Sequence, residues 1–138
     1  MKLITFISAG AIILLSAFVM KKNNIPTQSL YNTKWSLQKI HTAADVEQVS
    51  TKAFLKFDEA KKSAGGNGSC NSFGSDFTIS GNEISFKDIF STKMYCEGVQ
   101  QTEDSFFKQL EKVNHFKVKD KELILYQDKD VLLEFVSE

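Results

Sequence analysis

The stretch GGNGSCNSFGSDF, residues 65–77, has the residue types that most suggest chemistry. It contains four of the chain's seven glycines and one of its two cysteines. A dinucleotide-binding loop requires G-x-G-x-x-G before a helix, and a P-loop requires G-x-x-x-x-G-K-[ST]. The sixth residue from Gly66 is Asn71, and a strand pattern follows. We therefore expect the glycines at 65, 66, 68 and 74 to allow positive φ and close backbone approach. We expect Asn71 to cap a turn with its side chain.

The two cysteines, Cys70 and Cys96, suggest a disulfide if the chain is exported, because their number is even. On the chain-entropy model such a bond would stabilise the fold by about 3.5 kcal/mol. Two free buried thiols are the alternative. A metal site requires more ligands than two cysteines and two distant histidines, and a redox enzyme would use a C-x-x-C motif, which is absent. We expect no metal and no cofactor.

His41 and His115 are the candidates for a general base. Neither lies in a nucleophile motif such as G-x-S-x-G. His115 begins a predicted strand, and His41 borders a polar loop. A hydrolytic enzyme of unknown class that uses either histidine is therefore an alternative hypothesis.

Residues 1–22 have the pattern of an export signal. Lys2 precedes an uncharged, mostly apolar run from Leu3 to Met20, and Lys21 and Lys22 follow it. No small-x-small cleavage site is clear near the end of the run, which is about long enough to span a bilayer. A cleaved signal peptide and an N-terminal membrane anchor through residues 3–20 are both open. We expect an exported protein of the bacterial periplasm or cell envelope, with a linker at 23–29 and one domain at 30–138.

The charge pattern argues against a nucleic-acid-binding protein. The chain has 138 residues and no net charge, and all 17 of its basic residues are lysines. Removal of residues 1–22 takes away three lysines and leaves a net charge of −3. The body therefore lacks the arginine fork that binds phosphate and guanine edges, and it is slightly acidic.

Alternation of apolar and polar residues predicts a sheet. The predicted strands lie at 34–40, 52–58, 76–80, 83–88, 115–120, 122–127 and 131–136, with a hairpin at Gly81-Asn82. Residues 41–50 are read as a polar loop, with room for one helical turn. A helix is predicted at about 101–113, with Thr102 as N-cap and an apolar stripe through Phe106 and Leu110. The total is roughly seven or eight antiparallel strands and one helix.

Four short motifs occur in order along this body. They are KWSL at 34–37, SCN at 69–71, TKMYC at 92–96 and a Glu-x-x-Phe-x-x-x-Leu pattern at 103–110. Their order and spacing resemble the META domain, also called the HslJ-like family, from about Leu30 to Phe135. The residues that match its motifs are Trp35, Cys70, Asn71, Gly74, Thr92, Met94, Cys96 and Glu103.

The chain departs from the family pattern at two positions. Ser69 stands where a glycine is usual, and Tyr95 replaces a small residue beside Cys96. We therefore expect local differences in the turn and in the packing there. The resemblance implies that Cys70 and Cys96 lie close together, because both match the family's cysteine positions.

The resemblance implies an α+β fold with a strongly curved, barrel-like, mostly antiparallel sheet and one packed amphipathic helix. The family is often exported, includes a heat-inducible protein linked to novobiocin resistance, and implies no defined reaction or catalytic residues. We therefore expect a non-catalytic envelope protein in stress or antibiotic tolerance. Its expected partner is an envelope protein, a peptide, or a lipid or other small apolar ligand. A purely structural or assembly protein of the envelope is the further alternative.

Overall fold

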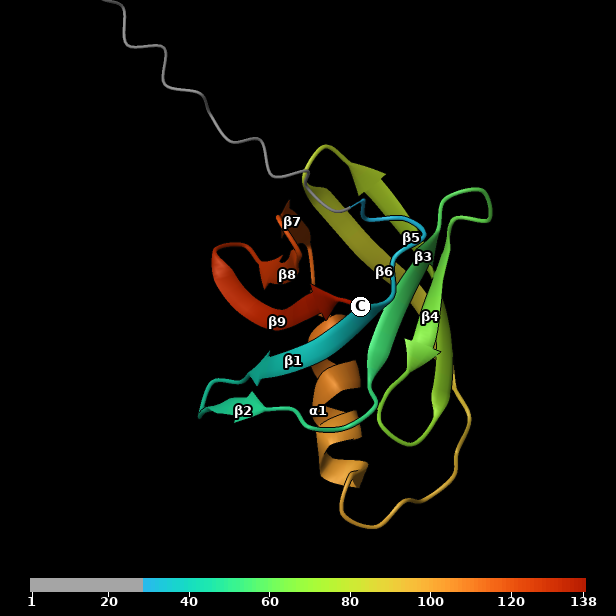
Figure 1. The fold of residues 1–138 in the computed structure, drawn as a ribbon, viewed down its shortest axis with the longest axis vertical. Helices are drawn as coiled ribbons and strands as arrows, with labels where there is room; N and C mark the ends of the chain where they lie inside the picture. Colours follow the sequence, from blue (N-terminus) through green and yellow to red (C-terminus); the bar gives the residue numbers. More distant parts are fainter. Residues whose placement is uncertain (1–28) are drawn as a thin grey trace, which may run out of the picture.

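The computed structural model describes residues 29–138, which form nine strands and one helix (Figure 1). The predicted signal or anchor, and the linker up to residue 28, lie outside the described residues. The elements are β1 Trp35–His41, β2 Val46–Gln48, β3 Phe54–Asp58, β4 Ser63–Asn67, β5 Ser72–Ser80, β6 Glu83–Ser91, α1 Gln100–Leu110, β7 His115–Lys119, β8 Glu122–Gln127 and β9 Asp130–Ser137.

The strands form one curved antiparallel sheet whose ends meet. The order is β2-β1-β3-β4-β5-β6-β7-β8-β9, and β9 pairs back onto β1. The pairing is shortest between β6 and β7, where Glu83 and His115 are the one register pair. The predicted α+β class and curved antiparallel sheet are confirmed, with nine strands in the described part instead of seven or eight.

Two strands lie where the sequence showed no strand pattern. β2 lies inside the stretch that we predicted to be a polar loop, and β4 lies at the start of the glycine-rich stretch. β2 has three residues and its side chains are at least partly exposed, so it has no buried face to show in its sequence. β4 contains Gly65 and Gly66, which carry no side chain to alternate.

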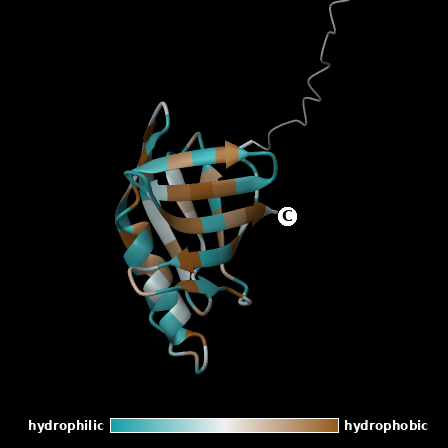
Figure 2. Cartoon of the chain, turned by 90° about the vertical axis from the view of Figure 1, so that its left-hand side faces the viewer, coloured by the Kyte–Doolittle hydropathy of each residue, from teal (hydrophilic) through white to brown (hydrophobic). Residues whose placement is uncertain are grey.

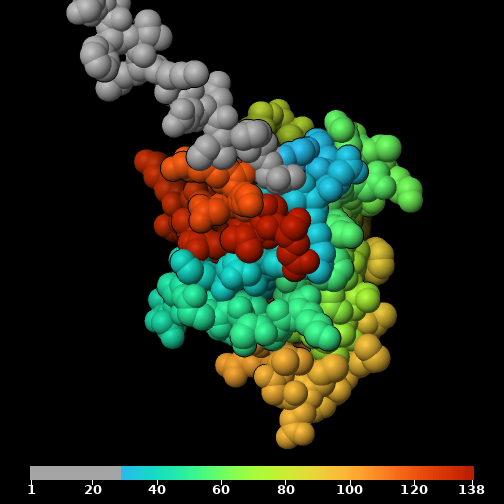
Figure 3. All heavy atoms as spheres, in the orientation of Figure 1, coloured from blue at the N-terminus to red at the C-terminus, as the bar shows by residue number. Residues whose placement is uncertain are grey.

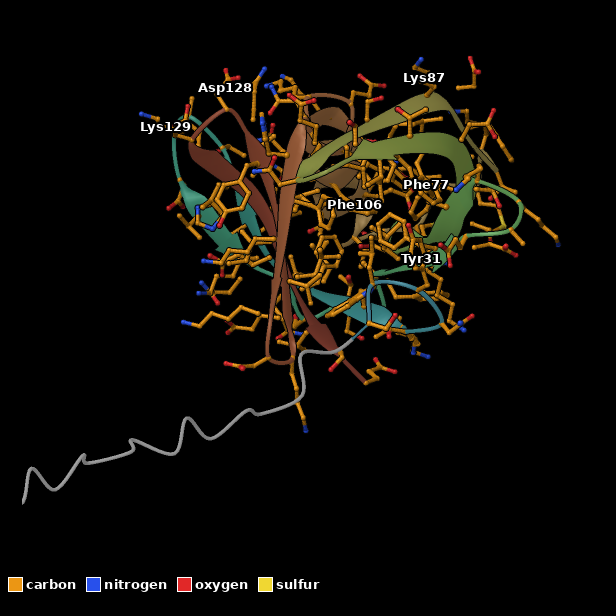
Figure 4. The ribbon with its side chains drawn as sticks, turned by 90° about the horizontal axis from the view of Figure 1, so that it is seen from above. Tyr31, Phe77, Lys87, Phe106, Asp128 and Lys129 are labelled. Atoms are coloured by element: carbon orange, nitrogen blue, oxygen red, sulfur yellow. A yellow bond between two sulfur atoms is a disulfide. The ribbon has the colours of Figure 1, made fainter. Side chains whose placement is uncertain are left out.

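The core lies inside the ring and is built mainly of aromatic and aliphatic side chains. Trp35 is fully buried, and its indole N–H donates to the carbonyl of Leu30 at 3.0 Å. Phe77 and Phe106 point into the ring, where Tyr31 also lies (Figure 4). Hydrophobic and hydrophilic residues alternate along several strands (Figure 2), as expected for a sheet with one buried face.

Helix α1 lies against β1 and β9 and presents the predicted stripe to the core, where Phe106 and Leu110 are fully buried. The predicted N-cap was wrong. The N-cap residue is Val99, without a side-chain cap, and the Thr102 hydroxyl donates to Glu47 Oε1 at 2.5 Å. The helix ends before 113 although Val113 is buried, because a buried apolar residue does not require helical backbone. Within residues 29–138, no helix is long and apolar enough to cross a lipid bilayer.

Candidate functional site

The glycine-rich stretch is mostly strand. β4 ends at Asn67 and β5 begins at Ser72, so only residues 68–71 form a turn. Our expectation of positive φ at the glycines of this stretch was wrong, since the described glycines with positive φ are Gly81 and Gly98. Close backbone approach is confirmed, because a Cβ on Gly66 would lie 2.0 Å from the carbonyl oxygen of Phe54.

The turn at 68–71 keeps a glycine-like conformation at Ser69, whose φ is 131°. The amide of Ser69 donates to Asn67 Oδ1 at 2.9 Å. The side chain that caps this turn is therefore Asn67, and our expectation of Asn71 was wrong. Asn67 ends a strand with its amide beside the turn, whereas the side chain of Asn71 is directed into the body.

Asn71 joins the turn to the loop that follows β6. It is 3% exposed. Its Nδ2 donates to the Met94 carbonyl at 3.0 Å, and its Oδ1 accepts from the Met94 amide at 2.8 Å. The Thr92 hydroxyl also donates to Oδ1, at 2.9 Å. The Asn71 side chain thus forms the pair of backbone hydrogen bonds with Met94 that a neighbouring strand would otherwise form.

Glu103, in the first turn of α1, holds Asn71 from the other side. Its carboxylate is buried, and it accepts from the amides of Cys70 and Asn71 at 2.8 and 2.6 Å and from Asn71 Nδ2 at 2.5 Å. None of the ion pairs in residues 29–138 includes Glu103. The carboxylate is stabilised by amide donors and by its place near a helix N-terminus. We call Asn71, Thr92, Met94 and Glu103 the Asn71–Glu103 network.

The predicted disulfide is present beside this network. Cys70 and Cys96 are joined, with their Cα atoms 5.8 Å apart. The bond ties the turn to the loop at 92–99, which lies at the end of the molecule below α1 in the views of Figures 1 and 3. Of the predicted family residues, Trp35 lies in the core of the ring and Gly74 on β5, whereas the other six meet at this one place.

The Asn71–Glu103 network is suited to hold the loop in place. Each side-chain oxygen and nitrogen of Asn71 and Glu103 has a hydrogen-bond partner inside the protein. Neither side chain has a free polar atom for a substrate. Within residues 29–138, no group of three His, Cys, Asp or Glu side chains is arranged to hold a metal ion.

The two histidines lie on different strands and contact different partners. His41 Nε2 lies 3.2 Å from Glu134 Oε1. His115 Nδ1 lies 2.7 Å from Asn114 Oδ1, and its Nε2 lies 4.0 Å from Glu83. The hydrogen bonds of these histidine side chains therefore go to a carboxylate and an amide, and not to a hydroxyl or thiol.

A groove of about 1100 Å³ crosses the outer face of β3, β4 and β5. Lys56, Gly65, Gly74 and Phe90 are successive partners across β3 to β6, so they form one row on this face. The two glycines leave the floor without side chains. The wall beside them is Phe90, which is 70% exposed. We call this feature the β3–β5 groove.

Sequence reasoning missed the β3–β5 groove. We noted the glycines, but the pairing of Gly65 with Gly74 follows only from the register of β4 on β5. Phe90 lies just beyond the predicted strand at 83–88 and belongs to β6. Alternation from the buried Ile84 and Phe86 would place Phe90 in the core, but a register shift between β5 and β6 turns it outward, and the sequence carried no signal for that shift.

The turn, the network and the disulfide occupy the motif positions of one family, and the model of that family, the META domain, matches residues 28–138. The chain belongs to the META domain family. No curated protein matches the chain. The META-domain chain is similar in fold to an NMR structure of a protein from Burkholderia xenovorans, with a TM-score of 0.67 and 20% identity over 79% of this chain and 83% of that one.

A second NMR structure of a protein has a TM-score of 0.56 and 19% identity, and the match covers 75% of the META-domain chain and 88% of the other. At these identities the two likenesses show the fold alone. Both matches span most of the solved chains.

Proposed function

We propose that this META-domain protein is a non-catalytic module of the bacterial cell envelope, which acts in stress or antibiotic tolerance by binding a partner or a small, partly apolar ligand. The observation that carries the proposal is the β3–β5 groove. It places a largely exposed aromatic ring beside a side-chain-free floor. Concave sites with an aromatic wall and a few polar groups are typical of ligand binding.

The polar chemistry of the family motifs supports a binding role over a catalytic one. The side chains of Asn71 and Glu103 form their hydrogen bonds with other groups of the protein. A catalytic acid or base needs a polar atom that can reach the substrate. The groove, by contrast, is open to solvent and takes no part in the network.

The envelope address is supported by two independent features. The apolar run at residues 3–20 has the pattern of an export signal or anchor. The disulfide between Cys70 and Cys96 is of the kind that persists in oxidising compartments.

A capture experiment with matched variants tests the binding role. The full chain is immobilised in mild detergent and exposed to an extract of a bacterial envelope, and retained lipids, peptides, glycans and proteins are identified by mass spectrometry. We expect a ligand that wild type and Tyr95→Ala retain and Phe90→Ala loses. Tyr95 is the matched control because its ring is 78% exposed but does not line the groove. Retention of the same material by all three proteins, or of nothing above bare resin, contradicts the proposal.

An assembly role is the second candidate, because Met94 and Tyr95 are 60% and 78% exposed on the disulfide-bonded loop. Large apolar side chains gathered on a surface often mark protein contacts. This role predicts the opposite variant pattern. Tyr95→Ala would lose a protein partner that Phe90→Ala retains.

A further inference from the structure

We infer that the β3–β5 groove takes an uncharged glycan, that is, a short chain of hydroxyl-bearing sugar rings. The inference rests on the proposed binding function and names the ligand class of the same site. It follows from the floor, the wall, the polar rim and the surroundings of the groove.

The floor has the shape that a flat ring needs. Gly65 on β4 pairs with Gly74 on β5, and a Cβ on Gly65 would lie 2.7 Å from the carbonyl oxygen of Phe73. Two adjacent positions on the outer face therefore lack side chains. The Phe90 ring covers Gly74, so the open backbone floor is at Gly65. A ring can lie there at van der Waals distance from the strands.

The wall is an aromatic face free for stacking. A Cβ on Gly74 would lie 2.6 Å from Phe90 Cζ, so the Phe90 ring leans over the floor. On the opposite side, Phe54 is already accompanied by lysine ammonium groups, with Lys34 and Lys56 at 5.0 and 5.9 Å from its centroid. Phe90 is therefore the open platform. The C–H faces of sugar rings stack on such platforms.

The rim offers hydrogen-bond donors and acceptors in alternation. In the row beside the glycines, Asp58 pairs with Ser63, Ser63 with Asp76, and Asp76 with Lys87. Hydroxyl groups can donate to the carboxylates of Asp58 and Asp76 and accept from Ser63 and from the lysines that line the groove. The charged residues that line the groove are Lys34, Lys56, Asp58, Asp76 and Glu138, which sum to −1. This balance disfavours an anion and suits an uncharged polyhydroxylated ligand.

The surroundings disfavour the two other ligand classes considered above. An extended peptide adds to a free strand edge, but β4 and β5 are paired on both sides at the groove, and β3 is paired with β4 along its length and with β1 at Phe54 and Leu55. The free edge is therefore limited to residues 56–58, which is short for adding a peptide strand. An acyl chain needs an enclosed apolar interior, but the inside of the ring is occupied by buried side chains such as Phe57 and Phe77. The groove volume of about 1100 Å³ exceeds one sugar ring, so a chain of several rings is expected.

The test uses two soluble, uncharged tetrasaccharides, one of β-1,4-linked N-acetylglucosamine and one of α-1,4-linked glucose. They are titrated into the ¹⁵N-labelled full chain in mild detergent. We expect at least one sugar to shift the amide signals of Gly65 and Gly74, and the comparison shows which linkage fits. Phe90→Ala should weaken binding about tenfold, the loss that one aromatic contact represents. Asp76→Ala should also weaken binding, and Tyr95→Ala should leave it unchanged. Circular dichroism checks that each variant is folded.

Two results overturn the inference. One is that neither sugar shifts the groove signals, and the other is that Phe90→Ala binds as tightly as wild type. If the sugars fail while the capture experiment still yields a ligand that depends on Phe90, the glycan is wrong and the binding function stands. If nothing captured depends on Phe90, the proposed function fails as well.

Discussion

At the scale of single residues, the buried carboxylate of Glu103 is the polar group on which the turn most depends. It is 2% exposed and accepts three hydrogen bonds from the turn at residues 70–71. Removing one partner from a buried polar group costs the desolvation of the group left behind. Glu103 acts as a hydrogen-bond acceptor. Glutamine has nearly the same shape without the charge, so its substitution tests the charge alone.

Glu103→Gln should lower the free energy of unfolding by about 2 to 3 kcal/mol, because an NH₂ group then faces amide donors or a weaker acceptor replaces the carboxylate. Chemical denaturation measures the change. Asp104→Asn, at an exposed position of the same helix turn, is the control and should change little. Equal stability of Glu103→Gln and wild type would show that the charge is not needed.

Ser69→Gly should raise the free energy of unfolding by about 1 kcal/mol, because Ser69 holds a φ of 131° that glycine adopts without strain. Ser72→Gly, in β5 with ordinary φ, is the matched control and should destabilise by about 0.5 to 1 kcal/mol. The thermal unfolding midpoints of both variants, each compared with wild type, test this prediction. Destabilisation by Ser69→Gly would mean that the contact of the Ser69 hydroxyl with Thr51 outweighs the strain.

The pKa of Glu138 is lowered below its usual 4.5, first by the hydrogen bond from Lys34 Nζ at 2.6 Å and then by that from Ser36. A lowered folded-state pKa means that the contribution to stability is present above the unfolded value and is lost as pH falls through the folded one. NMR titration of the Glu138 carboxyl group should show a midpoint below 4.5, and Lys34→Met should raise it. A midpoint at 4.5 or above in wild type would contradict the pairing.

At the scale of elements, the loop at 92–99 is held twice. The disulfide holds it through Cys96, and the side-chain amide of Asn71 holds it through Met94. The two attachments are next to each other but act differently. The disulfide restricts the unfolded chain, whereas the amide acts only in the folded one.

The double variant Cys70→Ser/Cys96→Ser should lose about 3.5 kcal/mol of stability on the chain-entropy model. The Met94 amide should nevertheless stay protected from hydrogen exchange, because Asn71 still accepts from it. Asn71→Ala, with the disulfide intact, should lose that protection. If the Met94 amide exchanges freely in the serine variant, the amide contacts depend on the disulfide. In wild type, full alkylation of both thiols without reductant would reject the bond.

At the scale of the whole molecule, β9 closes the sheet by pairing with both β8 and β1. Leu133 on β9 pairs with Ile40 of β1 and is fully buried. The first and last long strands of the described body are therefore held together, and stability depends on contacts between the two ends of that body. Most of the fold's pairings are local hairpins, so this closure is its longest-range step.

Leu133→Ala should cost about 2 to 5 kcal/mol, because it leaves a cavity where the two ends of the body meet. Val131→Ala, at a half-buried position of the same strand, should cost less. Denaturation midpoints compare the two. If both variants lose the same stability, the pairing of β9 with β1 at Leu133 contributes no more than an ordinary half-buried contact, and the prediction is wrong.

The local elements were predictable because periodicity depends only on backbone geometry. Alternation along 52–58 and 122–127 predicts strands wherever the chain folds, and the stripe at Phe106 and Leu110 predicts the helix. β4 was not predictable in this way, since Gly65 and Gly66 give no alternation. Thr102 has the type of an N-cap, but the acceptor Glu47 lies 55 residues away, and such a contact has no local signal.

The sequence by itself determined the apolar segment at 3–20, the lysine-only basic charge, most strands, the helix and the family motifs. Only the tertiary structure decided that Asn71 meets Glu103, 32 residues away, and that Gly65, Gly74 and Phe90 form one row. The physical reason is that residue types and short spacings set local conformation, whereas strand register sets which distant side chains meet. The glycine-rich stretch therefore supplies both the disulfide-bonded turn at 68–71 and the glycines of the β3–β5 groove. The register of β4 on β5 decides which of its residues belong to the groove.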